Sequence, residues 1–185
     1  MPSSHRLDRR SPLVVEIHDL ARRPGTMREL HREVPAPEGM GVDMIAVPEG
    51  SPIALDLRLE SAMEGVLVTG CADVQLHAEC ARCLRAFDYD DTFDLQELFF
   101  YPGREADEDA RWVVDELIDL EDVLRDAVVL ELPFTPLCRD DCAGLCLTCG
   151  VNLNDQPEHG HDGEFDPRWA GLVGLAGTEE PNTTL

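Results

Sequence analysis

Hydrophobic and polar residues alternate with a period of two over much of the first half of the chain. In residues 51–60, hydrophobic side chains fall on one face and charged ones on the other: Ile53, Leu55, Leu57 and Leu59 against Asp56, Arg58 and Glu60. Residues 64–80 and 84–100, EGVLVTGCADVQLHAEC and LRAFDYDDTFDLQELFF, follow the same pattern. Such alternation predicts antiparallel strands with one buried face and one solvated face.

Shorter elements are predicted on either side of these strands. The hydrophobic run LVVEIHDL, residues 13–20, predicts a strand. Residues 21–41 carry several prolines and glycines and predict turns or a long loop. Residues 101–112 are acidic and have no hydrophobic period, which predicts an exposed loop, and WVVDELI at 112–118 predicts a further short strand.

A helical period replaces the alternation in residues 119–133, DLEDVLRDAVVLELP. Hydrophobic side chains recur there at helical spacing, at Leu120, Val123, Leu124, Ala127 and Val128. Asp119 is the predicted N-cap, and Pro133 is predicted to end the helix. A second, short helix is predicted for residues 166–175, with Asp166 as its cap.

Acidic residues dominate the charge of the chain. Its 185 residues include 38 acidic and 15 basic ones, giving a net charge of −23, and every basic residue is an arginine. The acidic excess is concentrated between Asp88 and Glu131. Such a surface repels a phosphate backbone and attracts a basic partner. The simpler interpretation is a solvated face that keeps the protein soluble.

The sequence has the features of a cytoplasmic protein. No stretch approaches the roughly 20 consecutive apolar residues that cross a bilayer. The first twenty residues lack the apolar core and the cleavage site of an export signal. We therefore expect a cytoplasmic location and no membrane partner. In that reducing compartment the seven cysteines are expected to be thiols rather than disulfides.

Four of the seven cysteines lie close together in PLCRDDCAGLCLTCGVNLN, residues 136–154: Cys138, Cys142, Cys146 and Cys149. A tetrahedral zinc site needs thiolates about 2.3 Å from the metal, presented by tight turns. The piece CLTCG has the two-residue gap and the following glycine of a metal-binding knuckle. The most local arrangement places these four cysteines on one zinc ion, and this is the first choice of ligands.

Other groupings of the ligands remain open. Cys80 and Cys83, in ECARCLRAF, repeat the C-x-x-C spacing between two strand-like runs, and His159 and His161 follow the knuckle in EHGHDG. The alternatives pair the Cys146–Cys149 knuckle with Cys80 and Cys83 or with the two histidines. Together these eight potential ligands would fill two tetrahedral sites, so we expect one zinc ion and leave room for two.

Redox and hydrolytic chemistry are the competing interpretations. Redox-active C-x-x-C pairs open a helix in a βαβ unit, and neither pair here has that setting. Cys71, alone in a strand-like run, is expected to pack as a small hydrophobic residue. A catalytic zinc needs an open position and a base, for which HGHD offers Glu158 or Asp162, so a metal-dependent hydrolase or nuclease acting on RNA is the alternative function. An all-thiolate site is closed, so we favour a non-enzymatic protein and assign no catalytic residues.

The order of these pieces resembles the YceD family of large ribosomal RNA subunit accumulation proteins. The resemblance runs from about Leu13 to Leu175 and is carried by ECARCL, ELIDLEDVLRDAVVLELPFTPLC, CAGLCLTCGVNLN and DPRWAGL. It implies a role in making the large ribosomal subunit, tied to the production or stability of 23S ribosomal RNA, in a cytosolic bacterial protein or a plastid one in plants. Family genes commonly lie beside that of a small basic ribosomal protein, which implies a functional link.

Variation within the family also bears on the metal ligands. Some members carry C-x-C where this chain has His159-Gly160-His161, an exchange that keeps the metal-ligand chemistry. Other members lack most of the second cysteine cluster. The resemblance therefore implies that the metal is not essential to every member.

The sequence as a whole predicts an α+β fold: a mostly antiparallel β domain with one main helix and a C-terminal zinc-binding segment. Residues 10–135 form the core with its helix, residues 136–175 the cysteine-rich segment with a short helix, and residues 1–9 and 176–185 flexible ends. The expected function is non-enzymatic assistance to large ribosomal subunit biogenesis by binding.

Two binding mechanisms compete in this prediction. In one, the acidic stretch masks a basic ribosomal protein. In the other, a group of arginines contacts 23S rRNA directly: Arg22, Arg23, Arg28, Arg32, Arg82 and Arg85. The overall charge favours the first mechanism.

Overall fold

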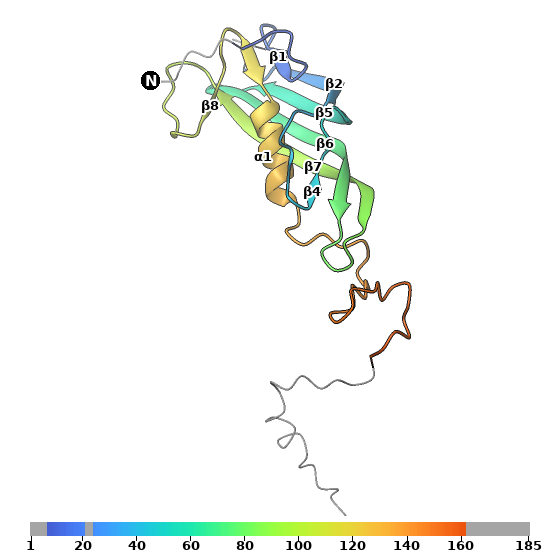
Figure 1. Ribbon diagram of the computed structural model, residues 1–185. Coiled ribbons are helices and arrows are strands. Elements are labelled where there is room, and N and C mark those ends of the chain that lie inside the picture. Colours follow the sequence, from blue (N-terminus) through green and yellow to red (C-terminus); the bar gives the residue numbers. More distant parts are fainter. Residues whose placement is uncertain (1–6, 21–23, 162–185) are drawn as a thin grey trace, which may run out of the picture. The chain divides into compact units, whose positions relative to one another are not determined.

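The structure of the protein is a computed structural model, which describes residues 7–20 and 24–161 (Figure 1). Residues 1–142 and residues 143–185 form two compact units, and the first unit holds every helix and strand that is described. The predicted short helix at residues 166–175 lies outside the described residues. Within the described part of the chain, no helix is long and apolar enough to cross a membrane.

Four long strands form the body of the first unit, and neighbouring strands are antiparallel. In spatial order they are β2 (Met27–Pro35), β5 (Pro52–Ser61), β6 (Gly65–Glu79) and β7 (Ala86–Phe100). β6 and β7 pair along their full length, from Gly65 opposite Phe100 to Glu79 opposite Ala86. The prediction of a mostly antiparallel sheet with one main helix is confirmed for the described residues.

Shorter strands extend this arrangement. β3 (Gly41–Val42) and β4 (Ile45–Ala46) form a hairpin, and β4 pairs with the C-terminal end of β6. β8 (Arg111–Trp112) pairs parallel with the C-terminal end of β7. β1 (Val14–Glu16) pairs with β9 (Leu117–Asp119) in a separate two-stranded sheet. The single strand predicted at residues 112–118 is thus divided between β8 and β9. The division falls at Asp115 and Glu116, whose φ angles of 51° and 61° are incompatible with a continuous strand.

β2 occupies part of residues 21–41, which were predicted to form turns or a long loop, so this prediction was wrong. Arginines at inward-facing positions of β2 obscure its alternation. Arg28 donates a hydrogen bond of 2.7 Å to the carbonyl of Glu16, and Arg32 donates one of 2.8 Å to the carbonyl of Pro12. These arginines occupy strand positions because the neighbouring backbone supplies acceptors for them.

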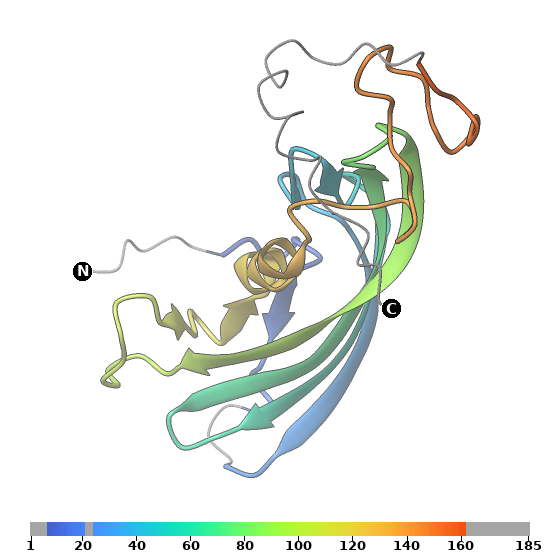
Figure 2. The ribbon, with the colours of Figure 1, turned by 90° about the horizontal axis from the view of Figure 1, so that it is seen from below.

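The predicted faces of the sheet are confirmed. Ile53, Leu55, Leu57 and Leu59 are at most 3% exposed, whereas Asp56 and Arg58 are exposed. The sheet is strongly curved, and α1 (Glu121–Glu131) lies on its concave side (Figure 2). The hydrophobic core fills the space between them, where α1 contributes Val123, Leu124 and Val128.

The start of α1 differs slightly from the prediction. The N-cap residue is Leu120, not Asp119. Asp119 precedes the cap, and its carboxylate still accepts a 3.0 Å hydrogen bond from the backbone N–H of Glu121. The carboxylates of Glu121 and Asp122 in the first turn interact favourably with the positive end of the helix dipole. The helix ends at Glu131, two residues before Pro133, as expected from the steric effect of proline.

Gly70 permits the close approach of β5 and β6 within the curved sheet. Its φ angle is +147°, and a Cβ atom there would lie 2.1 Å from the carbonyl oxygen of Asp56 and 2.8 Å from the Cα of Leu57. Both neighbours are backbone atoms, which cannot move aside without disturbing the β5–β6 pairing. A glycine inside a strand commonly marks such a place.

We predict that Gly70→Ala lowers the free energy of unfolding by about 3 kcal/mol, because the added methyl group collides with backbone atoms of β5. Urea denaturation followed by circular dichroism measures the change. Gly103→Ala is the matched control, since Gly103 also has a positive φ, of 86°, but a Cβ atom added there would meet no atom within 4 Å. The control should lose about 1 kcal/mol. Equal losses would mean that contact with β5 is not the cause.

Candidate metal centres

Eight potential ligands gather into two groups of four. Cys80, Cys83, Cys138 and Cys142 form the first group, and Cys146, Cys149, His159 and His161 form the second. Within each group the ligand atoms all lie within 4.8 Å of one another. Each group could hold a metal ion. The first belongs to the unit of residues 1–142 and the second to the unit that follows it.

The first group joins the tip of the β6–β7 hairpin to the segment after α1. Cys80 and Cys83 lie in the turn between β6 and β7, and Cys138 and Cys142 follow the helix. The Sγ atoms of Cys80 and Cys142 are 3.8 Å apart, and those of Cys83 and Cys138 are 3.7 Å apart. Thiolates at about 2.3 Å from a tetrahedral ion are separated by about 3.8 Å. The sulfur spacing therefore fits one tetrahedral ion.

Backbone hydrogen bonds shape the turn that carries Cys80 and Cys83. The N–H of Cys80 donates to the carbonyl of Arg85 at 2.9 Å, and the N–H of Leu84 donates to the carbonyl of Cys80 at 2.9 Å. Leu84 adopts a φ angle of 57°, which is uncommon for a leucine. The turn thus holds a strained residue directly after its second cysteine, in the manner of functional sites.

The second group has the same turn. The N–H of Cys146 donates to the carbonyl of Val151 at 2.7 Å, and the N–H of Gly150 donates to the carbonyl of Cys146 at 2.8 Å. Gly150 has a φ angle of 75° and so corresponds to Leu84 of the first group. The two C-x-x-C segments therefore share hydrogen bonds, spacing and a left-handed residue, and both form a metal-binding type of knuckle.

The two histidines complete the second group through their Nε2 atoms. Nε2 of His161 lies 3.2 Å from Sγ of Cys146, Nε2 of His159 lies 3.1 Å from Sγ of Cys149, and the two Nε2 atoms are 3.1 Å apart. These separations are slightly shorter than the roughly 3.4–3.6 Å expected around a tetrahedral ion with sulfur and nitrogen ligands. The four atoms converge on one point.

The environments of the thiols favour ionisation of one cysteine in each knuckle. Burial raises the pKa of Cys80, but hydrogen bonds from the backbone N–H groups of Cys138, Cys83 and Arg82 outweigh it and lower the pKa to about 6. Backbone N–H groups of Cys149 and Thr148 likewise lower the pKa of Cys146 to about 6. A thiolate is the form that binds a metal. Both knuckles are therefore prepared for an ion at neutral pH.

The pKa of Cys138 moves in the opposite direction. Burial raises it first, and hydrogen bonds with the thiols of Cys80, Cys83 and Cys142 raise it further, to about 12. Four close sulfurs cannot all carry a negative charge without a cation among them. An ion bound to this group would supply that charge and release protons from the remaining thiols.

Arg82 connects the two halves of the first group. Its Nη1 donates to the carbonyl of Asp140 at 3.2 Å and to the carbonyl of Cys142 at 3.0 Å. The backbone N–H of Ala81 also donates to the carbonyl of Pro136 at 2.8 Å. The arginine between the two cysteines of C-x-R-C thus holds the loop that carries the second cysteine pair. Sequence reasoning assigned Arg82 to RNA contact and missed this role.

The sequence singled out all eight residues of these two groups as potential ligands but gave first choice to a different grouping. Cys138, Cys142, Cys146 and Cys149 are not brought together as one group; the structure divides them after Cys142. The Cys146–Cys149 knuckle is instead grouped with His159 and His161, which was one of the alternatives. Cys80 and Cys83 lie opposite Cys138 and Cys142 because the β6–β7 hairpin and α1 bring distant parts of the chain together.

Acidic side chains cover the convex face of the main sheet. The register places nine of them outward on the four long strands: Glu29, Glu33, Asp56, Glu60, Asp73, Glu79, Asp88, Asp90 and Asp94. Arg58 is the only arginine that faces outward on these strands, and it is paired with Glu60 at 2.9 Å. The face therefore carries a strong negative charge.

The negative charge of this convex face affects the pKa of Cys71. It lies between Asp56 on β5 and Asp94 on β7 in the cross-strand register. Burial raises the pKa of its thiol, and the carboxylates of Asp73, Asp56 and Asp94 raise it further. Cys71 is partly exposed, so the expected packing as a buried hydrophobic residue is only partly met.

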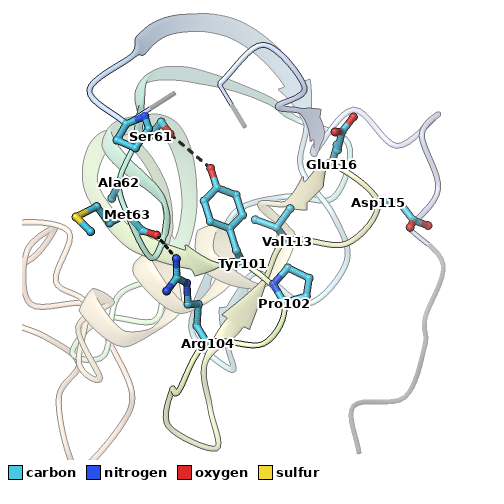
Figure 3. A pocket seen from close by; sticks show the side chains of 10 residues that line it. Ser61, Ala62, Met63, Tyr101, Pro102, Arg104, Val113, Asp115 and Glu116 are labelled. Atoms are coloured by element: carbon cyan, nitrogen blue, oxygen red, sulfur yellow. Dashed lines mark hydrogen bonds between the residues drawn. The ribbon is translucent and has the colours of Figure 1, made fainter. Parts of the chain in front are cut away.

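A cavity of about 490 Å³ is lined by Ser61, at the end of β5, and by Tyr101, directly after β7 (Figure 3). The first cysteine group lies at the opposite end of β7. The turn after β5 and the segment after β7 line the cavity, with Met63 and Tyr101 among the residues. Ser61 approaches the hydroxyl of Tyr101 at 3.5 Å, and Arg104 donates to the carbonyl of Met63 at 2.9 Å. Two carboxylates, those of Asp115 and Glu116, also line the cavity.

Comparison with known proteins gives one family match and several relatives. A family model described as "Large ribosomal RNA subunit accumulation protein YceD" matches residues 68–176. An uncharacterized protein of Mycobacterium tuberculosis is 49% identical over 174 residues, which cover 91% of this chain and 84% of the relative. An uncharacterized protein of Mycobacterium leprae is 43% identical over 179 residues, covering 94% and 82%.

More distant relatives carry a functional name. A chloroplastic large ribosomal RNA subunit accumulation protein, YCED homolog 1 of Zea mays, is 27% identical over 157 residues, covering 78% of this chain and 47% of the plant protein. No solved structure matches this chain.

We predict that Arg82→Met weakens metal binding at the first cysteine group by about 10- to 100-fold, because the loop of Cys138 and Cys142 loses its support. Competition between the protein and a chromogenic chelator for cobalt(II) or zinc measures the affinity. Arg58→Met is the control, since Arg58 lies on the convex face and pairs with Glu60. Unchanged affinity in Arg82→Met would contradict the positioning role.

Proposed function

Because the chain belongs to the YceD family of large ribosomal RNA subunit accumulation proteins, we propose that it is a non-enzymatic factor in large ribosomal subunit biogenesis. It acts in the cytoplasm by binding a basic ribosomal protein, and two structural zinc ions maintain its fold. The acidic convex face of the sheet is the observation that carries the proposal.

The convex face suits a basic protein better than RNA. Nine carboxylates on one rigid surface attract lysine- and arginine-rich segments over long distances and repel phosphates. A basic ribosomal protein bound there would be kept from nonspecific contacts with nucleic acid. Its release would follow when ribosomal RNA competes for the same basic side chains.

Several arginines of the competing RNA mechanism are engaged within the protein. Arg28 pairs with Asp19 at 2.8 Å and also binds a backbone carbonyl, as Arg32 does. Arg82 binds the loop of the first cysteine group. Arg22 and Arg23 lie outside the described residues. These contacts weaken the case for a prepared arginine surface and support the acidic face as the binding surface.

Zinc is the ion that these ligands suit best. Four thiolates, or two thiolates with two imidazoles, are the usual ligands of structural zinc. Each group supplies four protein ligands and leaves no position for substrate, which supports a structural rather than a catalytic role. Apparent binding free energies of structural zinc are about 10–16 kcal/mol in small peptides.

The second zinc would be the main source of order in its segment. Residues 143–161 contribute no side chain to the hydrophobic core and contain no helix or strand among the described residues. Local hydrogen bonds remain, such as that from the N–H of Ala143 to the side chain of Asn154 at 2.9 Å. These alone do not offset the conformational entropy of ordering such a segment.

We predict two moles of zinc per mole of protein prepared under reducing, chelator-free conditions, as measured by elemental analysis. Cys142→Ser and Cys149→Ser should each lose one zinc, and the double variant should lose both. If the four cysteines from Cys138 to Cys149 shared one ion, the double variant would lose no more zinc than either single variant. The control, Cys71→Ser, should keep both ions because Cys71 lies outside both groups.

We further predict that the protein binds the basic proteins of the large subunit more tightly than 23S rRNA at physiological salt. The affinity should fall about tenfold or more between 50 and 300 mM salt, since the attraction is between exposed charges. Fluorescence anisotropy with each purified partner measures it. Glu33→Lys with Asp73→Lys should weaken protein binding, whereas tight binding to RNA alone would contradict the proposal.

We expect no RNA hydrolysis by either the unaltered protein or the His161→Ala variant. RNA hydrolysis by the unaltered protein that is abolished in His161→Ala would instead support the hydrolase alternative.

A further inference from the structure

We infer that the open edge of β7, over residues 86–92, binds an extended segment of the basic partner as an additional strand of the sheet. The inference rests on the proposed function and specifies how the partner is held. The segment it fits alternates basic residues with hydrophobic or aromatic residues.

β7 is paired along one side only for most of its length. All fifteen of its residues pair with β6, but β8 pairs only with Phe99 and Phe100 on the other side. In the described part of the chain, residues 86–92 have no strand beside them on that side. A sheet edge of this kind presents backbone donors and acceptors to another chain.

Hydrogen bonds at both ends of the strand identify the groups that point outward. The N–H of Tyr101 donates to the carbonyl of Glu64, and the carbonyl of Arg85 accepts from the N–H of Cys80. The backbone N–H and C=O groups of the odd-numbered residues of β7 therefore point toward β6. The carbonyl of Phe100 accepts from Val113, on the opposite side. Because ladder hydrogen bonds alternate along an antiparallel strand, the N–H and C=O groups of Asp88 and Asp90 point away from the sheet.

The end of the open edge is defined by neighbouring groups. The N–H of Thr92 is already bonded to the side chain of Asp91 at 2.9 Å. Beyond it, Asp94 and Gln96 border a cavity of about 220 Å³ whose other wall is formed by α1. The helix therefore flanks the strand from residue 94 onward. Residues 86–92 are long enough for a strand of ordinary length.

The side chains beside this edge specify the chemistry of the partner. On the convex face, Asp88 and Asp90 are exposed carboxylates, and Asp88 is bonded to His77 at 2.6 Å. On the concave face, Phe87 and Tyr89 are half-buried, with ring centroids 5.8 Å apart. An added strand would place alternate residues on these two faces. Arginine or lysine would meet the carboxylates, and hydrophobic side chains would meet the rings.

A proline substitution distinguishes the contribution of a backbone hydrogen bond to peptide binding from the contribution of the carboxylate charge. Asp90→Pro removes an outward N–H while leaving the β6 ladder intact, and edge positions tolerate proline for this reason. Asp90→Ala removes the same charge but keeps the N–H. The probe is a nine-residue peptide that alternates lysine and valine, with a second peptide of the same sequence methylated on alternate backbone nitrogens.

We expect Asp90→Ala to weaken binding of the unmethylated peptide a few-fold and Asp90→Pro to weaken it about tenfold further. The methylated peptide should bind at least tenfold more weakly to the unaltered protein. Equal affinities of the two variants, both folded by circular dichroism, would overturn the inference. Should Asp90→Pro fail to fold, the measurement on the unaltered protein described next decides the outcome.

Residue-resolved hydrogen exchange on the unaltered protein provides that measurement. With peptide bound, the amides of Asp88 and Asp90 should exchange at least tenfold more slowly. The amides of Phe87 and Tyr89, already bonded to β6, should change little. Peptide binding without this alternating protection would overturn the added strand. The proposed function would still stand if basic ribosomal proteins bound in a salt-sensitive manner, and it would fail separately if only RNA bound.

Discussion

The pairing of β6 with β7 is the interaction on which the other parts of the structure depend. Fifteen consecutive residue pairs fix the two strands in one register. That register turns most hydrophobic residues of the two strands toward the concave core, and it turns Asp73, Glu79, Asp88, Asp90 and Asp94 toward the convex face. It also places the first C-x-x-C at the tip of the hairpin. A one-residue shift would exchange the two faces, so the core and the acidic surface cannot vary independently.

Much of the sheet could be predicted from the sequence because its alternation is regular. The alternation from Ile53 to Leu59, and that of the residues on β6 and β7, predicts both the strands and which of their faces is buried. β2 was missed for a physical reason: Arg28 and Arg32 point inward and satisfy backbone carbonyls that only the folded chain brings near. The helix was predicted from its period, but its first residue depends on backbone angles at Leu120 that the sequence does not reveal.

The candidate metal ligands were recognisable from residue type and spacing, whereas their grouping was not. Cys83 and Cys138 are 55 residues apart and meet through the hairpin and α1. Proximity along the chain favoured another set of four. The equivalence of Leu84 and Gly150 was also hidden, because a leucine gives no sign that its backbone is left-handed. Arg82 could be recognised only from the carbonyl groups that surround its guanidinium.

The different sequence separations within the two ligand groups have a consequence for the order of assembly. Cys149 and His159 are ten residues apart, so the second group closes a short loop at small entropic cost, and an ion could bind there as soon as those residues emerge from synthesis. Cys80 and Cys142 are separated by 62 residues. The first group is complete only after the hairpin and α1 have docked, so an ion there would bind late, after the rest of that unit has folded.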